Sequence, residues 1–341
     1  MRNSLPEDAP GAAAGEPGAA LRAAVSEGLR AAAAQAALAP LPVCAGYSGG
    51  LDSTVLLQEL AAARQQGGIA LSALHVHHGL SPHADAWAEH CLAVCAALEV
   101  PCRVVRVGVS RAPRTSLEEE ARRARHAAFA AQSEPVIALA HHADDQAETV
   151  LLQLLRGAGP KGLAGMPLLK PLSAAAPTPL LLRPLLAFSR EQLAAHARAA
   201  GWHWIEDESN QDNRLKRNFL RNAVAPLLRE GFPDPAQTLS RAARHQAEAA
   251  RLLDALADLD LAQAASGGAL VVERLVCLDD ERLKNALRRR LDVAGLRQPS
   301  EARLAALLRA LRESSNDTRL TWEHEGAKLV RRKGLLTLEM A

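Results

Sequence analysis

The chain has 341 residues, 48% of them hydrophobic, and its 40 basic and 38 acidic side chains leave a formal net charge of only +2. Such a chain can bury a core and form two domains, whereas no apolar stretch approaches the ~20 residues of a membrane-spanning helix. The start of the chain has no apolar signal region, and the five cysteines imply no disulfide framework. The sequence therefore predicts a cytoplasmic protein without a membrane partner.

The predicted elements begin after a short leader. Residues 1–17 are acidic and rich in Pro and Gly and are expected to be disordered, and Ala-rich residues 18–38 are expected to form a helix. Short β-branched runs and helical stretches then alternate. The expected strands are residues 43–45, 70–76, 102–107 and 136–139, and the expected helices are residues 53–65, 83–98, 116–131 and 144–156. This order predicts an α/β fold with a doubly wound, mostly parallel sheet that binds ligands at the carboxyl ends of its strands.

The pattern changes after the last of these helices. Residues 157–167 and 171–184 are rich in Gly and Pro and are expected to be irregular loops. Farther along, Ala-, Leu- and Arg-rich helical segments lead to short alternating strands over residues 318–338. We therefore expect the parallel-sheet domain to span residues 18–225 and a smaller, mainly helical α+β domain to span residues 226–341.

Basic residues gather in three short stretches. These lie within residues 214–221, 284–290 and 331–333. Local clustering of Lys and Arg matters more for nucleic-acid binding than the small net charge of the whole chain. Each cluster is equally typical of a solvated surface. The charges are therefore compatible with an RNA partner but do not by themselves indicate one.

The strongest local signal is the run YSGGLDST at residues 47–54, which follows an expected strand and opens an expected helix. Its two glycines allow a tight turn whose N–H groups, with the helix start and the hydroxyls of Ser48 and Ser53, can hold a polyphosphate. Asp52 is an unusual neighbour for phosphate unless Mg²⁺ lies between them. The run lacks the lysine of a Walker A loop, which disfavours a P-loop that transfers the γ-phosphate. The alternative to phosphate binding is a glycine-rich turn that holds no ligand.

This run resembles the SGGxDS loop of the PP-loop ATP-pyrophosphatases, which cleave ATP between its α and β phosphates. Further segments resemble, in order and spacing, the tRNA(Ile)-lysidine synthetases of that family, over roughly residues 40–225. They are residues 75–81, 117–125, 141–149, 156–163 and 207–210, followed by Arg217, Asn218 and Arg221. The resemblance implies that ATP is bound by Ser48, Gly49, Gly50, Leu51, Asp52, Ser53, His77 and His78, with Mg²⁺ at Asp52. His75 alternates with His77 along the expected strand, so one of these two is expected to be structural.

Acidic residues mark the segment HHADDQAET at residues 141–149. Asp144 and Asp145 lie four and three residues before Glu148, so a helix that begins here places two carboxylates on one face. Carboxylates this close require a cation, and either Mg²⁺ or the ammonium group of a substrate lysine would serve. Alternatively, these acids only complement the helix dipole. The resemblance implies catalytic roles for Asp145 and Glu148 and substrate binding by Asp144, and it leaves open which carboxylate contacts lysine.

Two groups of cations complete the expected site. Arg122 and Arg125 lie three apart on a helix and can reach phosphates or a developing negative charge, with Arg122 as a catalytic residue and Arg125 as a substrate-binding one. Their alternative is pairing with the acids at residues 118–120. Arg217, Asn218 and Arg221 are expected to hold RNA or to close over ATP.

The resemblance implies a ligase that uses ATP and Mg²⁺ to join free L-lysine to a tRNA. Lysine would replace the C2 oxygen of the first anticodon cytidine of tRNA(Ile) reading CAU, through an adenylylated intermediate. The product, lysidine, would change codon reading from AUG to AUA.

Two other functions are weighed against this one. A sulfur-inserting tRNA enzyme generally needs a CxxC pair, which the sequence lacks. A non-catalytic RNA-binding protein would not need the intact loop with its acids. Whether the chain forms a homodimer is left open by the sequence.

Overall fold

The computed structural model describes residues 17–109, 117–173, 176–206, 216–313 and 320–340. The chain divides into two compact units, Met1–Arg244 and His245–Ala341. The division falls within helix α10 (Pro235–Ala264), later than the expected start of a second domain at residue 226. The segment just before α10 belongs to the first unit because its arginines pair with acids of that unit. The expected leader falls almost entirely outside the described residues.

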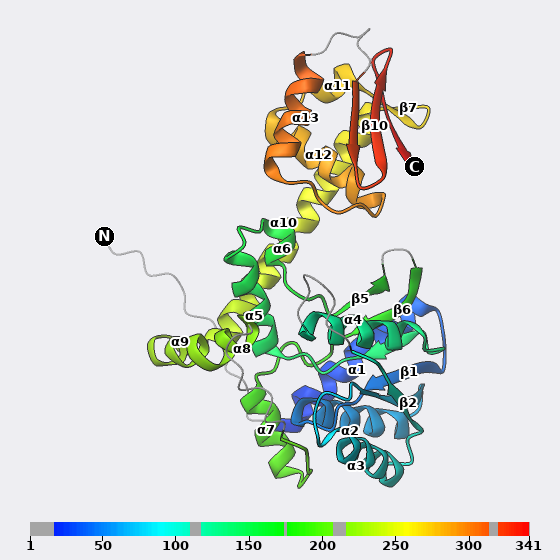
Figure 1. Ribbon diagram of the computed structural model, residues 1–341, viewed down its shortest axis with the longest axis vertical. Coiled ribbons are helices and arrows are strands. Elements are labelled where there is room, and N and C mark those ends of the chain that lie inside the picture. The colour runs from blue at the N-terminus through cyan, green and yellow to red at the C-terminus, as the bar shows by residue number, and fades with distance from the viewer. Residues whose placement is uncertain (1–16, 110–116, 174–175, 207–215, 314–319, 341) are drawn as a thin grey trace, which may run out of the picture. The chain divides into compact units, whose positions relative to one another are not determined.

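A six-stranded sheet with the order β3-β2-β1-β4-β6-β5 forms the centre of the first unit (Figure 1). Neighbouring strands are parallel except for β5 and β6. The chain moves outward from β1 to β3 and then returns to the other side of β1, so a topological switch point lies between β1 and β4. The strands are β1 (Leu41–Gly46), β2 (Ile69–His77), β3 (Cys102–Arg106), β4 (Val136–Ala138), β5 (Leu169–Ser173) and β6 (Ala176–Leu182).

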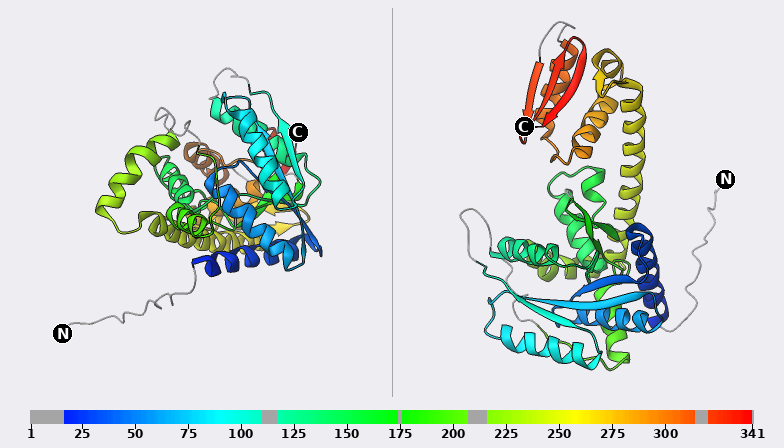
Figure 2. Two further views of the ribbon diagram at one scale, coloured as in Figure 1. Left: turned by 90° about the horizontal axis from the view of Figure 1, so that it is seen from below. Right: turned by 90° about the vertical axis from the view of Figure 1, so that its right-hand side faces the viewer.

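Helices cover both faces of this sheet (Figure 2). Val43 and Leu182 belong to a large apolar core shared with α1 and α2, whereas Cys44 and Leu181 point to the opposite face and pack with Phe129 of α4. This alternation confirms the predicted doubly wound α/β fold. The helices of the unit before α10 are α1 (Pro17–Ala36), α2 (Leu51–Gln65), α3 (Ala84–Ala97), α4 (Leu117–Ala130), α5 (Ala143–Leu154), α6 (Pro160–Leu163), α7 (Arg190–Ala199), α8 (Lys216–Phe219), the π-helix η2 (Leu220–Val224) and α9 (Ala225–Gly231).

The prediction of an irregular loop over residues 171–184 was wrong, because most of this stretch forms the antiparallel strands β5 and β6. Its prolines suggested a loop, but Pro171 lies in β5 at the edge of the sheet, where proline is tolerated. The apolar end of β6, Leu180–Leu182, is buried and pairs with β4. Burial of this short run therefore outweighs the local signal of the prolines.

The second unit is a smaller α+β fold, as predicted. Its five-stranded sheet has the order β7-β8-β11-β10-β9, and every neighbouring pair is antiparallel. Leu283, Leu287 and Leu291 lie four residues apart on one helix face and pack in its core. Its elements after α10 are β7 (Ala265–Ser266), β8 (Ala269–Val271), α11 (Val272–Val276), α12 (Asp280–Val293), α13 (Glu301–Glu313), β9 (Leu320–His324), β10 (Ala327–Arg332) and β11 (Leu335–Met340).

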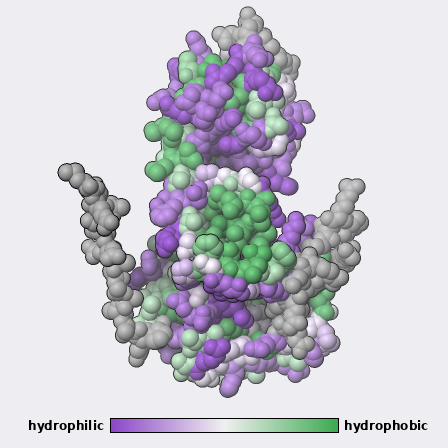
Figure 3. All heavy atoms as spheres, turned by 90° about the vertical axis from the view of Figure 1, so that its left-hand side faces the viewer, coloured by the Kyte–Doolittle hydropathy of each residue, from purple (hydrophilic) through white to green (hydrophobic). Residues whose placement is uncertain are grey.

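Large apolar side chains are exposed on the described part of the protein, but none of its helices is a candidate membrane span. None of the described helices is both long enough and apolar enough to cross a bilayer. Exposed large apolar residues include Leu154, Leu155, Leu227 and Phe232, and Figure 3 shows a continuous hydrophobic area on one face. All five cysteines are free thiols, in agreement with the sequence.

Candidate functional site

The loop between β1 and α2 is closed by two serine hydroxyls. Ser48 Oγ and Ser53 Oγ lie 3.0 Å apart, and Ser53 Oγ accepts from the Ser48 N–H at 3.2 Å and donates to Gly50 O at 3.0 Å. Gly50 immediately precedes Leu51, the first residue of α2, so the free N–H groups of the helix start belong to the same turn. The turn thus offers hydroxyl and amide donors of the kind that hold a polyphosphate.

Only glycine fits at residue 49, because of the backbone conformation there and because a side chain would collide with its neighbours. The φ of Gly49, +83°, lies in the left-handed region, and a Cβ at this position would lie 2.9 Å from Ile205 Cδ1 and 3.1 Å from Cys91 Sγ. The Ile205 N–H also donates to Gly49 O at 2.8 Å. Any side chain here would strain the turn and displace the segment that supports it.

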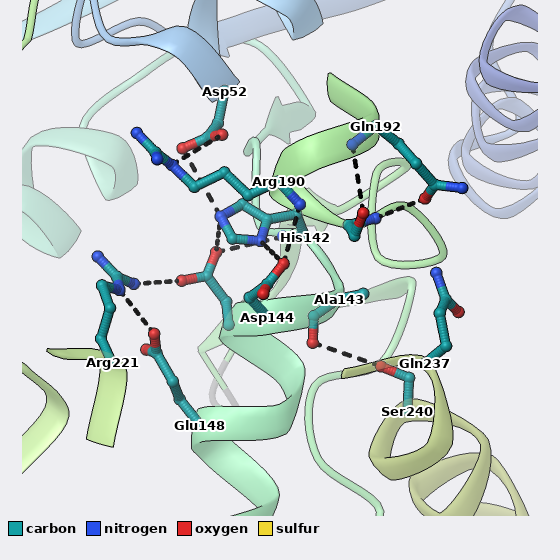
Figure 4. A network of polar contacts seen from close by, with 12 residues as sticks. Asp52, His142, Ala143, Asp144, Glu148, Arg190, Gln192, Arg221, Gln237 and Ser240 are labelled. Carbon is teal, nitrogen blue, oxygen red and sulfur yellow. Dashed lines mark hydrogen bonds and ion pairs between the residues drawn. The ribbon is translucent and has the colours of Figure 1, made fainter. Parts of the chain in front are cut away.

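His142 connects the loop helix to the acidic segment. Its side chain is 3% exposed, and its Nε2 lies 3.7 Å from Asp52 Oδ2 and 3.4 Å from Asp145 Oδ2. Its Nδ1 lies 3.4 Å from Asp144 Oδ2. Burial disfavours the charged imidazole, but the three carboxylates outweigh burial and raise the pKa of His142. The imidazole of His142 therefore lies among acids from α2 and α5, and these acids favour its protonated form (Figure 4).

Two arginines, one from α8 and one from η2, contact Asp145 and Glu148. Arg221 contacts both acids, with Nη2 3.1 Å from Asp145 Oδ1 and Nε 2.7 Å from Glu148 Oε1. Arg217 Nε lies 3.3 Å from Glu148 Oε2. The structure thus brings together four of the predicted residues, and it shows that the cations pair with the acids. The contact of Arg221 with Glu148 can be followed in Figure 4.

The two carboxyl groups respond differently to this environment. Burial opposes ionisation of Asp145, but His142, His141 and Arg221 hold its pKa below the ordinary value. In Glu148, burial prevails over the charge of Arg221 and raises the pKa. Glu148 is therefore the better proton acceptor of the two, and Asp145 is the better permanent anion.

Asp144 shares His142 with Asp145 but also has two partners that Asp145 and Glu148 lack. It accepts the Arg190 N–H at 2.8 Å and lies 2.8 Å from Arg229 Nη2. Burial opposes its ionisation, yet His142 and these contacts hold the pKa of Asp144 well below its ordinary value. These partners tie α5 to α7 and α9, which favours a positioning role over the predicted contact with substrate.

The predicted histidines have different surroundings. His77 Nε2 lies 3.2 Å from Asp85 Oδ1 and 3.3 Å from Arg106 Nη1, so it already has protein partners. His78 Nδ1 is buried and has no hydrogen-bond partner among the described residues. Burial and the charge of Arg125 lower the pKa of His78. His75 Nδ1 contacts Tyr47 O at 3.0 Å, which makes it the structural member of the run.

Arg122 and Arg125 extend from α4 at the same edge of the sheet. Both are exposed, and both make contacts within the protein. Arg125 lies near enough to His78 and His141 for its charge to lower their pKa values. The structure thus places these arginines beside the predicted site, while their catalytic and substrate-binding roles stay predictions.

The residues present fit a single magnesium ion at the loop. Asp52 Oδ1 is buried and accepts no hydrogen bond from the described residues. Burial raises the pKa of Asp52, although the charges of His142 and Arg190 oppose this effect, so a bound cation would further favour the ionised carboxylate. No cluster of three or more acidic, His or Cys ligands occurs among the described residues. Mg²⁺ bound by one carboxylate together with phosphate oxygens is consistent with this donor set.

Sequence reasoning missed three members of the site. It quoted His142 within a motif but gave it no role, and it did not identify Arg190 or Arg229. Arg190 Nε lies 3.9 Å from Asp52 Oδ1, and Arg229 pairs with Asp144. His142 is the N-cap residue of α5, but histidine is not among the residue types that mark the start of a helix in a sequence. The two arginines come from α7 and α9 and carry no motif in the sequence.

Other predicted features lie elsewhere or are not described. Residues 207–210 and Arg214 fall outside the described residues. In the second unit, Lys284 and Arg288 both contact the carboxylate of Glu301, at 2.9 and 2.6 Å. Arg331 is buried and donates to Leu311 O at 3.2 Å. Much of the basic character predicted for this unit is therefore used in internal contacts.

Known proteins resemble both units. A family model described as a PP-loop domain matches residues 28–228, and another, described as a TilS substrate binding domain, matches residues 270–337. The tRNA(Ile)-lysidine synthase of Alkalilimnicola ehrlichii is 48% identical over 82% of this chain and 63% of its own length. That of Chromobacterium violaceum is 47% identical over 77% of this chain and 60% of its own length. The chain spans about three-fifths of the length of these curated relatives.

A solved structure shares the fold. The U34-tRNA thiolase NcsA from Methanococcus maripaludis, solved with its [4Fe-4S] cluster, aligns with a TM-score of 0.51 at 16% sequence identity. The alignment covers 66% of this chain and 80% of that chain. Similarity at this level of identity concerns the fold alone.

Proposed function

The chain belongs to the PP-loop family, and we propose that it uses ATP to join the ε-amine of free L-lysine to C2 of the first anticodon cytidine of tRNA(Ile) reading CAU. ATP adenylylates the C2 oxygen and releases pyrophosphate, and the amine then displaces AMP. The C2 oxygen leaves with AMP, so the tRNA gains lysine less one water. The names of the relatives that match 82% and 77% of this chain support this choice among PP-loop reactions.

The observation that carries the proposal is the position of His142 between Asp52 and Asp145. Asp52 belongs to the helix that begins at the phosphate loop, and Asp145 lies one helical turn from Glu148. Distances of 3.7 and 3.4 Å from one imidazole nitrogen place a loop carboxylate beside the acidic pair. A site that binds polyphosphate and a site that binds an amine can therefore act on one base.

Activation of the cytidine requires that negative charge on the phosphates be stabilised. The hydroxyls of Ser48 and Ser53 and the N–H groups of the α2 start hold the leaving pyrophosphate, and Asp52 would hold Mg²⁺, which would supply further positive charge. Arg122 approaches from α4 and stabilises negative charge on the α-phosphate during its transfer to the base. Fixed donors of this kind favour the transition state because they need little reorganisation.

The attack by lysine requires a cation site that also accepts a proton. Asp145 remains ionised and attracts the ammonium group, while Glu148, with its raised pKa, takes the proton that leaves the amine. Arg217 and Arg221 hold both carboxylates in place. Both carboxylates already contact arginines, and the permanent negative charge of Asp145 favours an ammonium group over an uncharged amine.

The alternative of sulfur insertion has little support in the cysteines. Cys91 and Cys95 lie four residues apart in α3, and neither has exposed surface. Burial raises the pKa of Cys91 to about 12. Persulfide chemistry requires an accessible thiolate, which this environment disfavours. The likeness to a thiolase fold therefore does not extend to this pair.

Pyrophosphate release tests the proposal. Purified protein is given ATP with tRNA(Ile) carrying CAU, with the same tRNA changed at its first anticodon base, or without tRNA, each with and without lysine. We expect release only with the cytidine present, and transfer of labelled lysine to the same tRNA. Release that ignores the anticodon base, or the absence of release in every mixture, would contradict the proposal.

A further inference from the structure

Two residues that the proposed reaction does not use lie on the α4 face of the sheet. In the β5/β6 register, Lys170 pairs with Leu181, and Leu181 packs against Phe129 of α4. Directly paired residues of antiparallel strands point to the same face, and alternate residues of one strand do so too. The Arg183 N–H donates to Leu168 O at 2.8 Å, which continues the pairing beyond β6. Lys170 and Arg183 therefore project toward α4.

Helix α4 presents basic residues to the same place. Arg122, Arg125 and His126 are spaced three and four residues apart and continue the stripe that ends at buried Phe129. Burial is the largest cause that lowers the pKa of His126, and the charges of four cations lower it further, to about 4. These cations are Arg122, Arg125, Lys170 and Arg183. His126 is therefore neutral at pH 7. We define the cation cluster as Arg122, Arg125, Lys170 and Arg183.

Arg183 is the buried member of the cluster. Arg183 is only 4% exposed, and its Nη1 donates to Pro167 O at 3.0 Å. Its Nε is buried and finds no acceptor among the described residues. Burial and the charge of Arg122 lower the pKa of Arg183 to about 10. A buried guanidinium with an unused donor beside other cations is costly to maintain unless an anion completes it.

The position of the cluster distinguishes it from the phosphate loop. Arg183 follows β6, whereas the loop follows β1, and β4 lies between these two strands. Strands in a sheet are spaced by ~4.8 Å, so the strands β1 and β6 that lead to the two sites are roughly 10 Å apart. The cluster therefore follows a different strand from the one that carries the phosphate loop.

We propose that the cation cluster, with Arg183 and Lys170 at its centre, binds a backbone phosphate of the RNA substrate next to the nucleotide that reacts. Arginine and lysine are the side chains that bind RNA phosphates, and such contacts fix the register of a nucleic acid without reading its bases. The proposal rests on the proposed function for its RNA, and it adds Lys170 and Arg183 as residues that position the anticodon loop.

Lys170→Ala is the informative variant because Lys170 is exposed, so its loss spares the core. A labelled anticodon stem-loop carrying CAU is titrated at several KCl concentrations, and ATP affinity is measured in parallel. We expect RNA affinity to fall about 5- to 10-fold at low salt, and the slope of log affinity against log salt to decrease by roughly 0.7 to 1, with ATP affinity unchanged. Lys170→Arg should restore the affinity. Arg30→Ala removes one exposed charge from α1 and should change neither quantity.

An unchanged salt slope in Lys170→Ala would overturn the proposal. A loss of ATP affinity with unchanged RNA affinity would also overturn it, since the phosphate would then belong to ATP. Arg183→Lys keeps the charge but loses the planar fork, and we expect RNA affinity to fall with little change in melting temperature. Failure of the proposed function is distinguishable, because it appears as missing lysine transfer by the unaltered protein.

Discussion

The charged residues at the carboxyl edge of the sheet form two groups, which differ in whether opposite charges lie next to one another. Around α5, each carboxylate lies within ion-pair distance of an arginine or of His142. Around α4 and β6, the charges that act on Lys170 and Arg183 are those of other cations. The first group is balanced within the protein, whereas the second contains like charges whose mutual repulsion burial makes worse.

This difference shows how the two groups can respond to ligands. The balanced group is preorganised, because its side chains are held in place before a substrate arrives. Substitutions in this group should therefore lower the rate of the chemical step by a large factor. The charges that act on Lys170 and Arg183 are those of other cations, so the effect of an anion bound there should appear in binding and in salt dependence. The predictions below test this contrast, beginning with the largest expected effect.

Asp52→Asn should abolish the reaction with little effect on the fold. The substitution removes the carboxylate that we propose holds Mg²⁺ at the loop, and we expect pyrophosphate release to fall by at least about 100-fold. The fold should persist because the contacts of Asp52 with His142 and Arg190 are as long as 3.7 and 3.9 Å. Steady-state release and the melting temperature measure the two effects. Glu27→Gln on α1 is the matched control, and near-normal release by Asp52→Asn would refute the role.

Glu148→Gln and Asp144→Asn should separate chemistry from positioning. Loss of the proton acceptor at residue 148 should lower the rate of lysine transfer by about 10- to 100-fold, while adenylylation, followed as pyrophosphate release, changes less. Asp144→Asn should instead lower stability by roughly 1 to 2 kcal/mol, because Arg229 and the Arg190 N–H lose a charged acceptor. Urea unfolding and single-turnover kinetics distinguish the two. Similar kinetic defects in both variants would contradict the division of roles.

His142 should make the stability of the first unit depend on pH. Because its folded-state pKa is raised, its contribution is complete below the ordinary value of about 6.5 and is lost as pH rises through the folded-state pKa. In this window the unfolding free energy should fall with a slope of at most about 1.4 kcal/mol per pH unit. Urea unfolding of the protein and of His142→Gln across this range measures the slope. Equal slopes for the two proteins would show that His142 is not charged among the acids.

The smallest effect is expected at the start of α7. Ser189 Oγ accepts from the Gln192 N–H at 3.2 Å, and Gln192 Oε1 accepts from the Ser189 N–H at 2.8 Å. Ser189→Ala should cost about 1 kcal/mol, since it removes the cap of the helix that carries Arg190. Thermal unfolding measures this cost. A large loss of activity without loss of stability would mean that Ser189 has a more direct role.

Much of the fold and part of the site could be predicted from the sequence. The alternation of β-branched and helical runs was sufficient for four strands and four helices of the first unit, because each run is long enough to show its period. The ordered motifs pointed to lysidine synthetases, and the relatives confirm that resemblance. The β5/β6 pair was missed because its prolines suggest a loop and only tertiary burial of Leu180–Leu182 decides otherwise.

Contacts between distant segments could not be read from the sequence. Arg221 lies 76 residues from Asp145 and 73 from Glu148, so no local spacing connects them. The sequence predicted that arginines and acids contribute to one site, but not that they pair with one another. Lys170 and Arg183 were also not identified, because their common face depends on the β5/β6 register.

The central claim is that lysine replaces the C2 oxygen of one cytidine, and mass analysis of the tRNA tests it most directly. tRNA(Ile) reading CAU is incubated with the protein, ATP and lysine, digested, and its nucleosides are separated and weighed. The account predicts that the first anticodon cytidine gains the mass of lysine less one water, and that omission of ATP or lysine prevents the gain. An unchanged cytidine in the complete mixture, or a gain at another nucleotide, would contradict it.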